Sequence, residues 1–155
     1  IELEFKGNSV LLVDDSIVRG NTSRKIVEMA RKAGAKKVYF ASASPPIIGP
    51  DPYGIDLPST SDLVAADHSI PEICNIIGAD ALFYTTIKDL HWAVRVGNPK
   101  IRAFSDGCFT GHYPTPEVTP KLLRKLGSTR NEVRNTHTIQ ESQENADQTK
   151  MMALV

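Results

Sequence analysis

Apolar positions in the first part of the chain follow two different patterns. Residues 10–13 form a continuous apolar run, V-L-L-V, which is typical of a strand buried on both faces of a parallel sheet. From about residue 22 to 33, small and apolar residues recur on one helical face, and Gly34 follows as a stop signal. Residues 37–41, K-V-Y-F-A, predict a second buried strand. Because a helix joins them, we expect the two strands to be adjacent and parallel in a βαβ unit.

Helix and strand signals resume after a stretch rich in proline. Residues 44–58 hold five prolines and two glycines, which predicts an irregular loop. Ser69 and Glu72 then have the spacing of a capping box, and the apolar stripe behind them predicts a helix that ends at a glycine. Residues 81–84 predict a third short strand. The capping spacing repeats after it, before a helix that runs to about Val94.

This order of elements predicts an α/β fold with a parallel sheet. We expect residues 1–115 to form its core and residues 116–155 to form a polar, partly disordered tail, because apolar residues become too sparse there to offset the entropy of ordering. The chain opens at Ile1, within sequence that has strand-forming character. We therefore expect a core that is incomplete on its amino-terminal side, with an open sheet edge and an uncovered apolar face.

Composition excludes several classes of function. The 18 Lys and Arg residues balance the 18 Asp and Glu residues, so the formal net charge is zero. A neutral chain argues against binding of nucleic acid or of a membrane surface through a broad basic face. No window approaches the roughly 18 consecutive apolar residues of a spanning helix, and residues 1–6 do not resemble a signal peptide, which predicts a cytoplasmic protein. Cys74 and Cys108 are too few and too isolated for a disulfide framework, and we expect reduced thiols.

The stretch from residue 10 to 23, V-L-L-V-D-D-S-I-V-R-G-N-T-S, places two acids and a small polar turn between a strand and a helix. Ligands of open α/β sheets bind at this end of the strands. The backbone N–H groups and hydroxyls of residues 16–23 can meet at the positive end of the helix dipole, which suits a phosphate, and Arg19 adds positive charge. Asp14 and Asp15 can accept hydrogen bonds from hydroxyls or lie near a hard divalent cation. Phosphate and diol together describe a phosphorylated sugar.

Simpler interpretations of these residues stay open. Asp14 and Asp15 could merely end a strand, and Thr22 could merely cap a helix. A response-regulator receiver also begins with an apolar strand followed by two acids. It further needs a phospho-acceptor Asp at the end of a later strand, whereas Asp51 and Asp56 belong to the proline-rich loop.

The complete stretch resembles the phosphoribosyl-pyrophosphate (PRPP) binding motif of type I phosphoribosyltransferases, and its S-I-V-R-G version is similar to that of the amidophosphoribosyltransferases. Further landmarks look like the carboxyl-terminal part of those enzymes. They are E-M-A at 28–30, A-G-A-K-K-V-Y at 33–39, A-S-A at 41–43, Y-G-I-D at 53–56, I-I-G-A-D at 76–80 and F-T-G at 109–111.

The resemblance implies a Rossmann-like phosphoribosyltransferase core and transfer of ammonia from glutamine to PRPP, giving 5-phosphoribosylamine at the start of purine synthesis. It implies that the acids hold the ribose hydroxyls and help organise Mg²⁺, and that the turn after them cradles the 5-phosphate. The implied PRPP-binding residues are Asp14, Asp15, Ser16, Ile17, Val18, Arg19, Gly20, Asn21, Thr22 and Ser23. The implied partners are PRPP, ammonia from a glutaminase domain upstream of Ile1, purine nucleotide inhibitors and, for the intact enzyme, further copies of itself.

Two departures from the family pattern affect what is expected of the site. The family usually has Thr where Asn21 stands, which puts the affinity for phosphate in question. Some relatives carry four cysteines for an iron–sulfur cluster, but Asp51 and Ser105 occupy likely ligand positions here, so we expect no cluster. Tyr53 and its loop are expected to border the substrate site. A PRPP-sensing regulator without catalysis is the alternative function within this fold.

Overall fold

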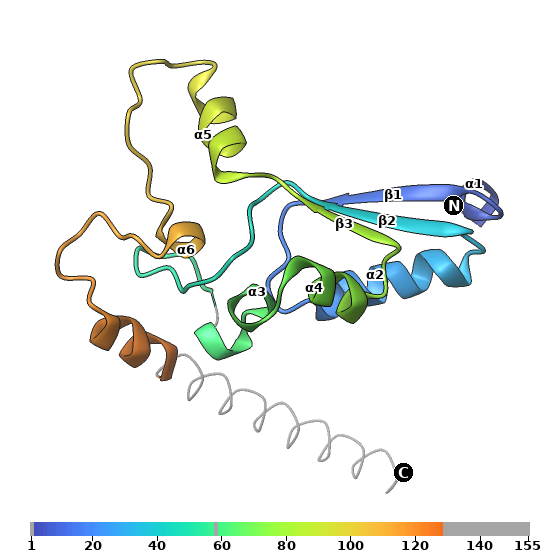
Figure 1. Cartoon of the computed structure of the whole chain (residues 1–155), viewed down its shortest axis with the longest axis horizontal. Coiled ribbons are helices and arrows are strands. Elements are labelled where there is room, and N and C mark those ends of the chain that lie inside the picture. The colour runs from blue at the N-terminus through green and yellow to red at the C-terminus, as the bar shows by residue number, and fades with distance from the viewer. Residues whose placement is uncertain (1, 58, 129–155) are drawn as a thin grey trace, which may run out of the picture.

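The computed structural model describes residues 2–57 and 59–128, and its centre is a sheet of three parallel strands (Figure 1). The strands are β1 (Ser9–Asp14), β2 (Lys37–Ser42) and β3 (Ala81–Tyr84), and their order in the sheet is β1-β2-β3. Helix α2 (Asn21–Lys32) connects the first two strands, and helix α4 (Ile70–Ile77) precedes the third. The predicted α/β fold and the parallel pairing of the first two strands are confirmed.

Two of the three predicted helices, α2 and α4, begin and end where the sequence signals predict. Helix α2 follows Gly20, whose φ is 76°, and Gly34 turns the chain with a φ of 88°. At the start of α4 the Ser69 N–H donates to the Glu72 carboxylate over 2.7 Å, as the capping spacing predicts. Gly78 ends α4 with a φ of 75°.

The hydrophobic core lies on one face of the sheet. Val38 and Phe40 of β2 are fully buried against α2 and α4, which lie on the same side of the sheet (Figure 1). On the other face Leu11, Val13 and Phe83 are 57%, 69% and 56% exposed. The prediction that residues 10–13 are buried on both faces is therefore wrong for the described chain, because burial alternates along β1. The predicted uncovered apolar face is present.

The start of the chain differs from the sequence-based expectation. Residues Glu2–Phe5 form a short helix, α1, where strand-forming sequence was expected. One contact and one backbone angle account for the helix and the turn after it. The Asn8 side-chain amide donates to the Glu4 carbonyl over 2.9 Å, and Gly7 has a φ of 78°. Because of this turn, β1 begins only at Ser9.

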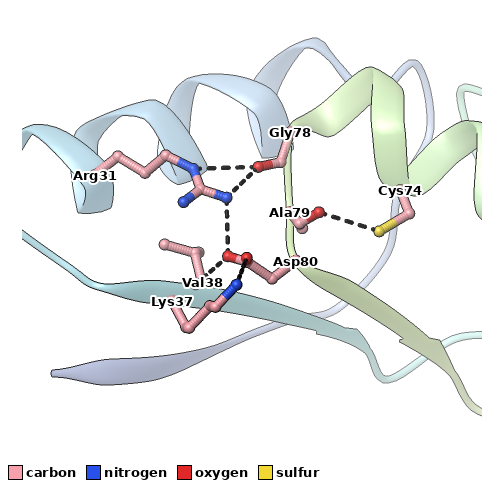
Figure 2. Close-up of polar contacts among 7 residues, drawn as sticks. All are labelled: Arg31, Lys37, Val38, Cys74, Gly78, Ala79 and Asp80. Atoms are coloured by element: carbon pink, nitrogen blue, oxygen red, sulfur yellow. Dashed lines mark hydrogen bonds and ion pairs between the residues drawn. The ribbon is translucent and has the colours of Figure 1, made fainter.

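At the amino ends of β2 and β3, the carboxylate of Asp80 joins three elements (Figure 2). Asp80, immediately before β3, accepts hydrogen bonds from Arg31 of α2 over 2.9 Å and from Lys37 of β2 over 2.8 Å. It also accepts the backbone N–H of Val38 over 2.8 Å, and Arg31 additionally donates to the Gly78 carbonyl over 2.7 Å. These contacts hold the pKa of Asp80 well below its usual range.

The described part of the proline-rich segment, residues 44–57, is irregular, as predicted, and it packs around a second, smaller apolar cluster. That cluster contains Ile47, Leu57, Leu63 and Cys108. Four short helical elements belong to this half of the chain, and three of them were not predicted from the sequence. The three are η1 (Thr60–Asp62), α3 (Val64–Asp67) and α6 (Gly107–Thr110), and the fourth is α5 (Ile87–Arg95).

Helix α5 was predicted, and Thr86 caps it by accepting the Asp89 N–H over 3.1 Å. It projects away from the sheet and has no buried residue (Figure 1). Residues 120–128, which the sequence assigned to the polar tail, are helical. Residues 129–155 lie outside the described residues, so the partial disorder expected there stays a prediction.

Candidate functional site

A pocket of about 440 Å³ opens where β1 ends and α2 begins. It brings together nine of the ten residues that the sequence assigned to the site. The lining residues are Asp14, Asp15, Ser16, Val18, Arg19, Gly20, Asn21, Thr22 and Ser23. Ile17 is the exception, because its side chain is 1% exposed and belongs to the hydrophobic core. Ile17 packs into the core beneath the pocket and does not line it.

The two acids are held in place by the backbone of the neighbouring strand. Asp14 is the last residue of β1, and beyond it the Ala43 N–H donates to the Asp14 carbonyl over 2.9 Å. The Ser44 N–H donates to the Asp15 carbonyl over 2.9 Å, so the parallel pairing continues past both strands. Among the described residues, the carboxylates bond to their immediate neighbours: Asp14 accepts the Asp15 N–H over 3.0 Å, and Asp15 accepts the Ser16 hydroxyl over 2.8 Å. Such carboxylates retain lone pairs for a ligand hydroxyl or a cation.

The first turn of α2 offers backbone N–H groups to the pocket. The first helical hydrogen bond runs from the Arg24 N–H to the Gly20 carbonyl over 2.9 Å. The N–H groups of Asn21, Thr22 and Ser23 precede it and have no carbonyl partner within the helix. No side chain caps this helix, so the alternative in which Thr22 acts as the cap is wrong. Uncapped N–H groups at the positive end of a helix dipole favour an anion.

Arg19 is the positive charge of the pocket, and a residue far along the chain is paired with it. Its guanidinium lies 3.3 Å from the Asp62 carboxylate of η1, and its side chain is about one-third exposed. The same turn is tied to α3 by the Val64 N–H, which donates to the Val18 carbonyl over 2.9 Å. Asp62 and Val64 were not predicted to lie near the site, because no local pattern links them to a turn on the other side of the proline-rich loop.

The pocket contains two of the carboxylates that a hard cation prefers. Among residues 2–57 and 59–128, no group of three or more His, Cys, Asp or Glu side chains could hold a metal ion. Mg²⁺ in phosphate-handling sites is commonly bound through only one or two carboxylates, with water and substrate oxygens completing its shell. Asp14 and Asp15 fit that kind of shared site.

Tyr53 does not line this pocket. Its ring lies 6.4 Å from that of Tyr113, whose hydroxyl donates to the Pro50 carbonyl over 2.8 Å. Asp51, at a likely cluster-ligand position, accepts the N–H groups of Tyr53 and Ile55, both over 2.9 Å. Its negative charge also contributes to the raised pKa of the Cys108 thiol, after the larger effect of burial. This carboxylate therefore has a structural role within its loop.

The receiver interpretation loses its remaining support from the strand ends. Strand β2 ends at Ser42 and β3 ends at Tyr84, so neither supplies the phospho-acceptor Asp that a receiver carries after a later strand.

In the described part of the chain, no helix is long and apolar enough to cross a membrane.

Comparison with known proteins identifies several amidophosphoribosyltransferases as relatives. No family model matches the chain. It is 50% identical over 132 residues to the amidophosphoribosyltransferase of Haemophilus influenzae, covering 85% of this chain and 26% of that protein. The Escherichia coli and Saccharomyces cerevisiae amidophosphoribosyltransferases are 52% and 44% identical over 83% and 87% of this chain, again 26% of each relative.

Solved structures agree. The glutamine PRPP amidotransferase of B. subtilis, complexed with ADP and GMP, matches with a TM-score of 0.69 and 40% identity over 77% of this chain and 27% of its own. A structure described as the allosteric regulatory enzyme of purine biosynthesis matches with a TM-score of 0.70 and 40% identity over 79% of this chain and 27% of its own. The chain spans about a quarter of the length of these relatives. The matched part of this chain is therefore homologous to the amidophosphoribosyltransferases, as the motif between residues 10 and 23 predicts.

Proposed function

We propose that this chain carries the PRPP-binding loop of an amidophosphoribosyltransferase, a glycosyltransferase. The complete enzyme would convert PRPP and ammonia from glutamine into 5-phosphoribosylamine, pyrophosphate and glutamate, the first step of de novo purine synthesis. One observation carries the proposal: nine of the ten predicted PRPP-binding residues line a single pocket at the carboxyl end of β1. The names of the relatives support the same activity, although the chain spans only 26% of their length.

The phosphate end of the substrate would lie against the first turn of α2. The N–H groups of Asn21, Thr22 and Ser23 and the Thr22 hydroxyl would donate to the 5-phosphate, where the helix dipole also favours negative charge. Asn21 replaces the Thr usual in the family. Its backbone N–H is unaffected by the replacement, and its side-chain amide remains a hydrogen-bond donor.

The ribose would lie over the acids. Asp14 and Asp15 would accept hydrogen bonds from the 2′- and 3′-hydroxyls, and their negative charge would stabilise a ribose that becomes positive as the bond to pyrophosphate breaks. Both residues would also help hold Mg²⁺, which when bound neutralises charge on the pyrophosphate leaving group. The contribution of this chain to catalysis is therefore positioning and electrostatic stabilisation.

The complete protein would need further components. We propose that ammonia reaches this pocket from a glutaminase domain, that the intact enzyme forms homo-oligomers and that it works in the cytoplasm. Purine nucleotides would compete for the phosphate end of the pocket, an expectation supported by the relative whose structure was described with ADP and GMP. We expect no iron–sulfur cluster.

Calorimetric titration of the chain with ribose 5-phosphate, and with PRPP in the presence of Mg²⁺, tests the proposal. Both should bind, and ribose, which lacks the phosphate, should bind far more weakly. Circular dichroism would establish that the titrated protein is folded. A folded chain that binds neither phosphorylated ligand at millimolar concentration would contradict the proposed function.

A further inference from the structure

Arg19 is shared between the pocket and a carboxylate outside it. The residue lines the pocket, yet its Nη2 lies 3.3 Å from Asp62 Oδ2, which is longer than the about 2.7–2.9 Å typical of a charged hydrogen bond. Both side chains are about one-third exposed. An ion pair this long and this exposed is weak, because water screens it and both side chains lose rotamer freedom.

The guanidinium is also incompletely satisfied. Arg19 Nε is buried and has no hydrogen-bond partner among the described residues. A buried N–H without a partner is costly, so an arrangement that gives it an acceptor is favoured. A phosphate in the pocket would offer two parallel acceptors and up to two negative charges, whereas Asp62 offers one negative charge at 3.3 Å.

We propose that Asp62 competes with the bound phosphate for Arg19. With the pocket empty, Asp62 holds the guanidinium; when a phosphate binds, the guanidinium turns to it and the Asp62 carboxylate is released. The inference rests on the proposed function, because it concerns the same phosphate. It goes further by giving Asp62, a residue outside the binding loop, a role in setting the affinity for phosphate.

The surroundings restrict this exchange to side chains. Leu63 and Val64, which follow Asp62, are 2% and 8% exposed, and the Val64 N–H is bonded to the Val18 carbonyl over 2.9 Å. The backbone on both sides of the ion pair is therefore fixed. Release of Asp62 would therefore reorient its side chain at the end of η1 without moving the turn that holds Arg19.

Calorimetric titration of the full 155-residue chain with inorganic phosphate and with ribose 5-phosphate tests the proposal. Asp62→Asn removes the competing charge and should tighten binding of both ligands roughly threefold to fivefold, the range expected for loss of an exposed ion pair. Asp62→Glu keeps the carboxylate and should bind about as the unmodified chain does. Asp67→Asn is the matched control, because it makes the same charge change at an exposed position of α3 and should change affinity by less than about 1.5-fold.

A double-mutant cycle separates competition from a general charge effect. In an Arg19→Ala background, Asp62→Asn should no longer tighten binding. Equal affinities for the unmodified chain and Asp62→Asn, or weaker binding by the variant while circular dichroism shows a native fold, would overturn the inference and leave the proposed function intact. Tightening that persists without Arg19 would also overturn it. Failure of both the unmodified chain and Asp62→Asn to bind any phosphate would instead count against the proposed function.

Discussion

Arg31 Nη2 lies 2.9 Å from Asp80 Oδ2, so the carboxylate that precedes β3 is bonded to the last turn of α2. The same carboxylate binds the Lys37 ammonium and the Val38 N–H at the start of β2 (Figure 2). Three elements are thereby joined at the end of the sheet opposite the pocket. Packing fixes which face of each helix is buried, and these bonds fix where α2 ends relative to the strands.

Asp80→Asn should destabilise the chain in a pH-dependent way. The contacts lower the pKa of Asp80 in the folded state, whereas the unfolded value is about 3.9. A depressed folded pKa gives stability that is present above the unfolded pKa and lost as pH falls below about 4 toward the folded value. Urea unfolding at pH 7 and pH 3 should therefore show a lower midpoint for the variant at pH 7 and a smaller difference at pH 3. A difference independent of pH would show that the charge of Asp80 has no part in it, and Asp67→Asn serves as the exposed control.

Gly20→Ala should lower both stability and phosphate affinity. The φ of Gly20 is 76°, in the left-handed region, and an added Cβ would meet its nearest neighbour, Ile77 Cγ2, at an ordinary 3.6 Å. The cost is therefore backbone strain, about 1–2 kcal/mol for an L-residue in this region. Gly97→Ala is the control, because a Cβ there meets nothing within 4 Å and no positive φ is required. Denaturant midpoints and ribose 5-phosphate titrations of the two variants provide the comparison. Equal behaviour would mean that the turn relaxes without strain.

In the complete enzyme proposed above, Asp14→Asn or Asp15→Asn should lower turnover at least about tenfold, a loss of roughly 1.4 kcal/mol of transition-state stabilisation. The amide keeps the size of the side chain but removes the charge that would stabilise the ribose as it becomes positive. Steady-state kinetics with PRPP and ammonia measure the effect without involving glutamine hydrolysis. Near-normal kcat/KM in both variants would remove the acids from the site.

Truncation of two phenylalanines in neighbouring strands should change the free energy of unfolding by very different amounts. Phe40 is fully buried in the core, whereas Phe83 is 56% exposed on the uncovered face. Phe40→Ala should cost about 3–5 kcal/mol, because it removes core packing and leaves a cavity. Phe83→Thr should change the free energy of unfolding by less than about 0.5 kcal/mol, since the site is exposed and Thr suits a strand. It should also reduce self-association in sedimentation experiments. A large loss of stability in Phe83→Thr would mean that this face is covered in solution.

Local sequence patterns were sufficient for the elements that build the core. Gly20, Gly34 and Gly78 all have a positive φ, which favours glycine, and they flank α2 and α4. The bounds of these two helices were therefore predicted closely. The continuous apolar run at 10–13 could not reveal its uncovered face, because apolar residues on both sides say nothing about what covers them. The pocket was predicted because its lining is contiguous in the chain, whereas the Arg19–Asp62 pair joins residues 43 positions apart and no periodicity predicts it.

The bonds from Ala43 and Ser44 to the carbonyls of Asp14 and Asp15 give the pocket a spectroscopic reporter. These two amides lie outside the binding loop, yet each can exchange with deuterated solvent only when its bond to the acidic edge opens. Their exchange rates therefore measure how often that edge separates from the start of the proline-rich loop. A ligand that holds the acids should slow both rates without touching either amide.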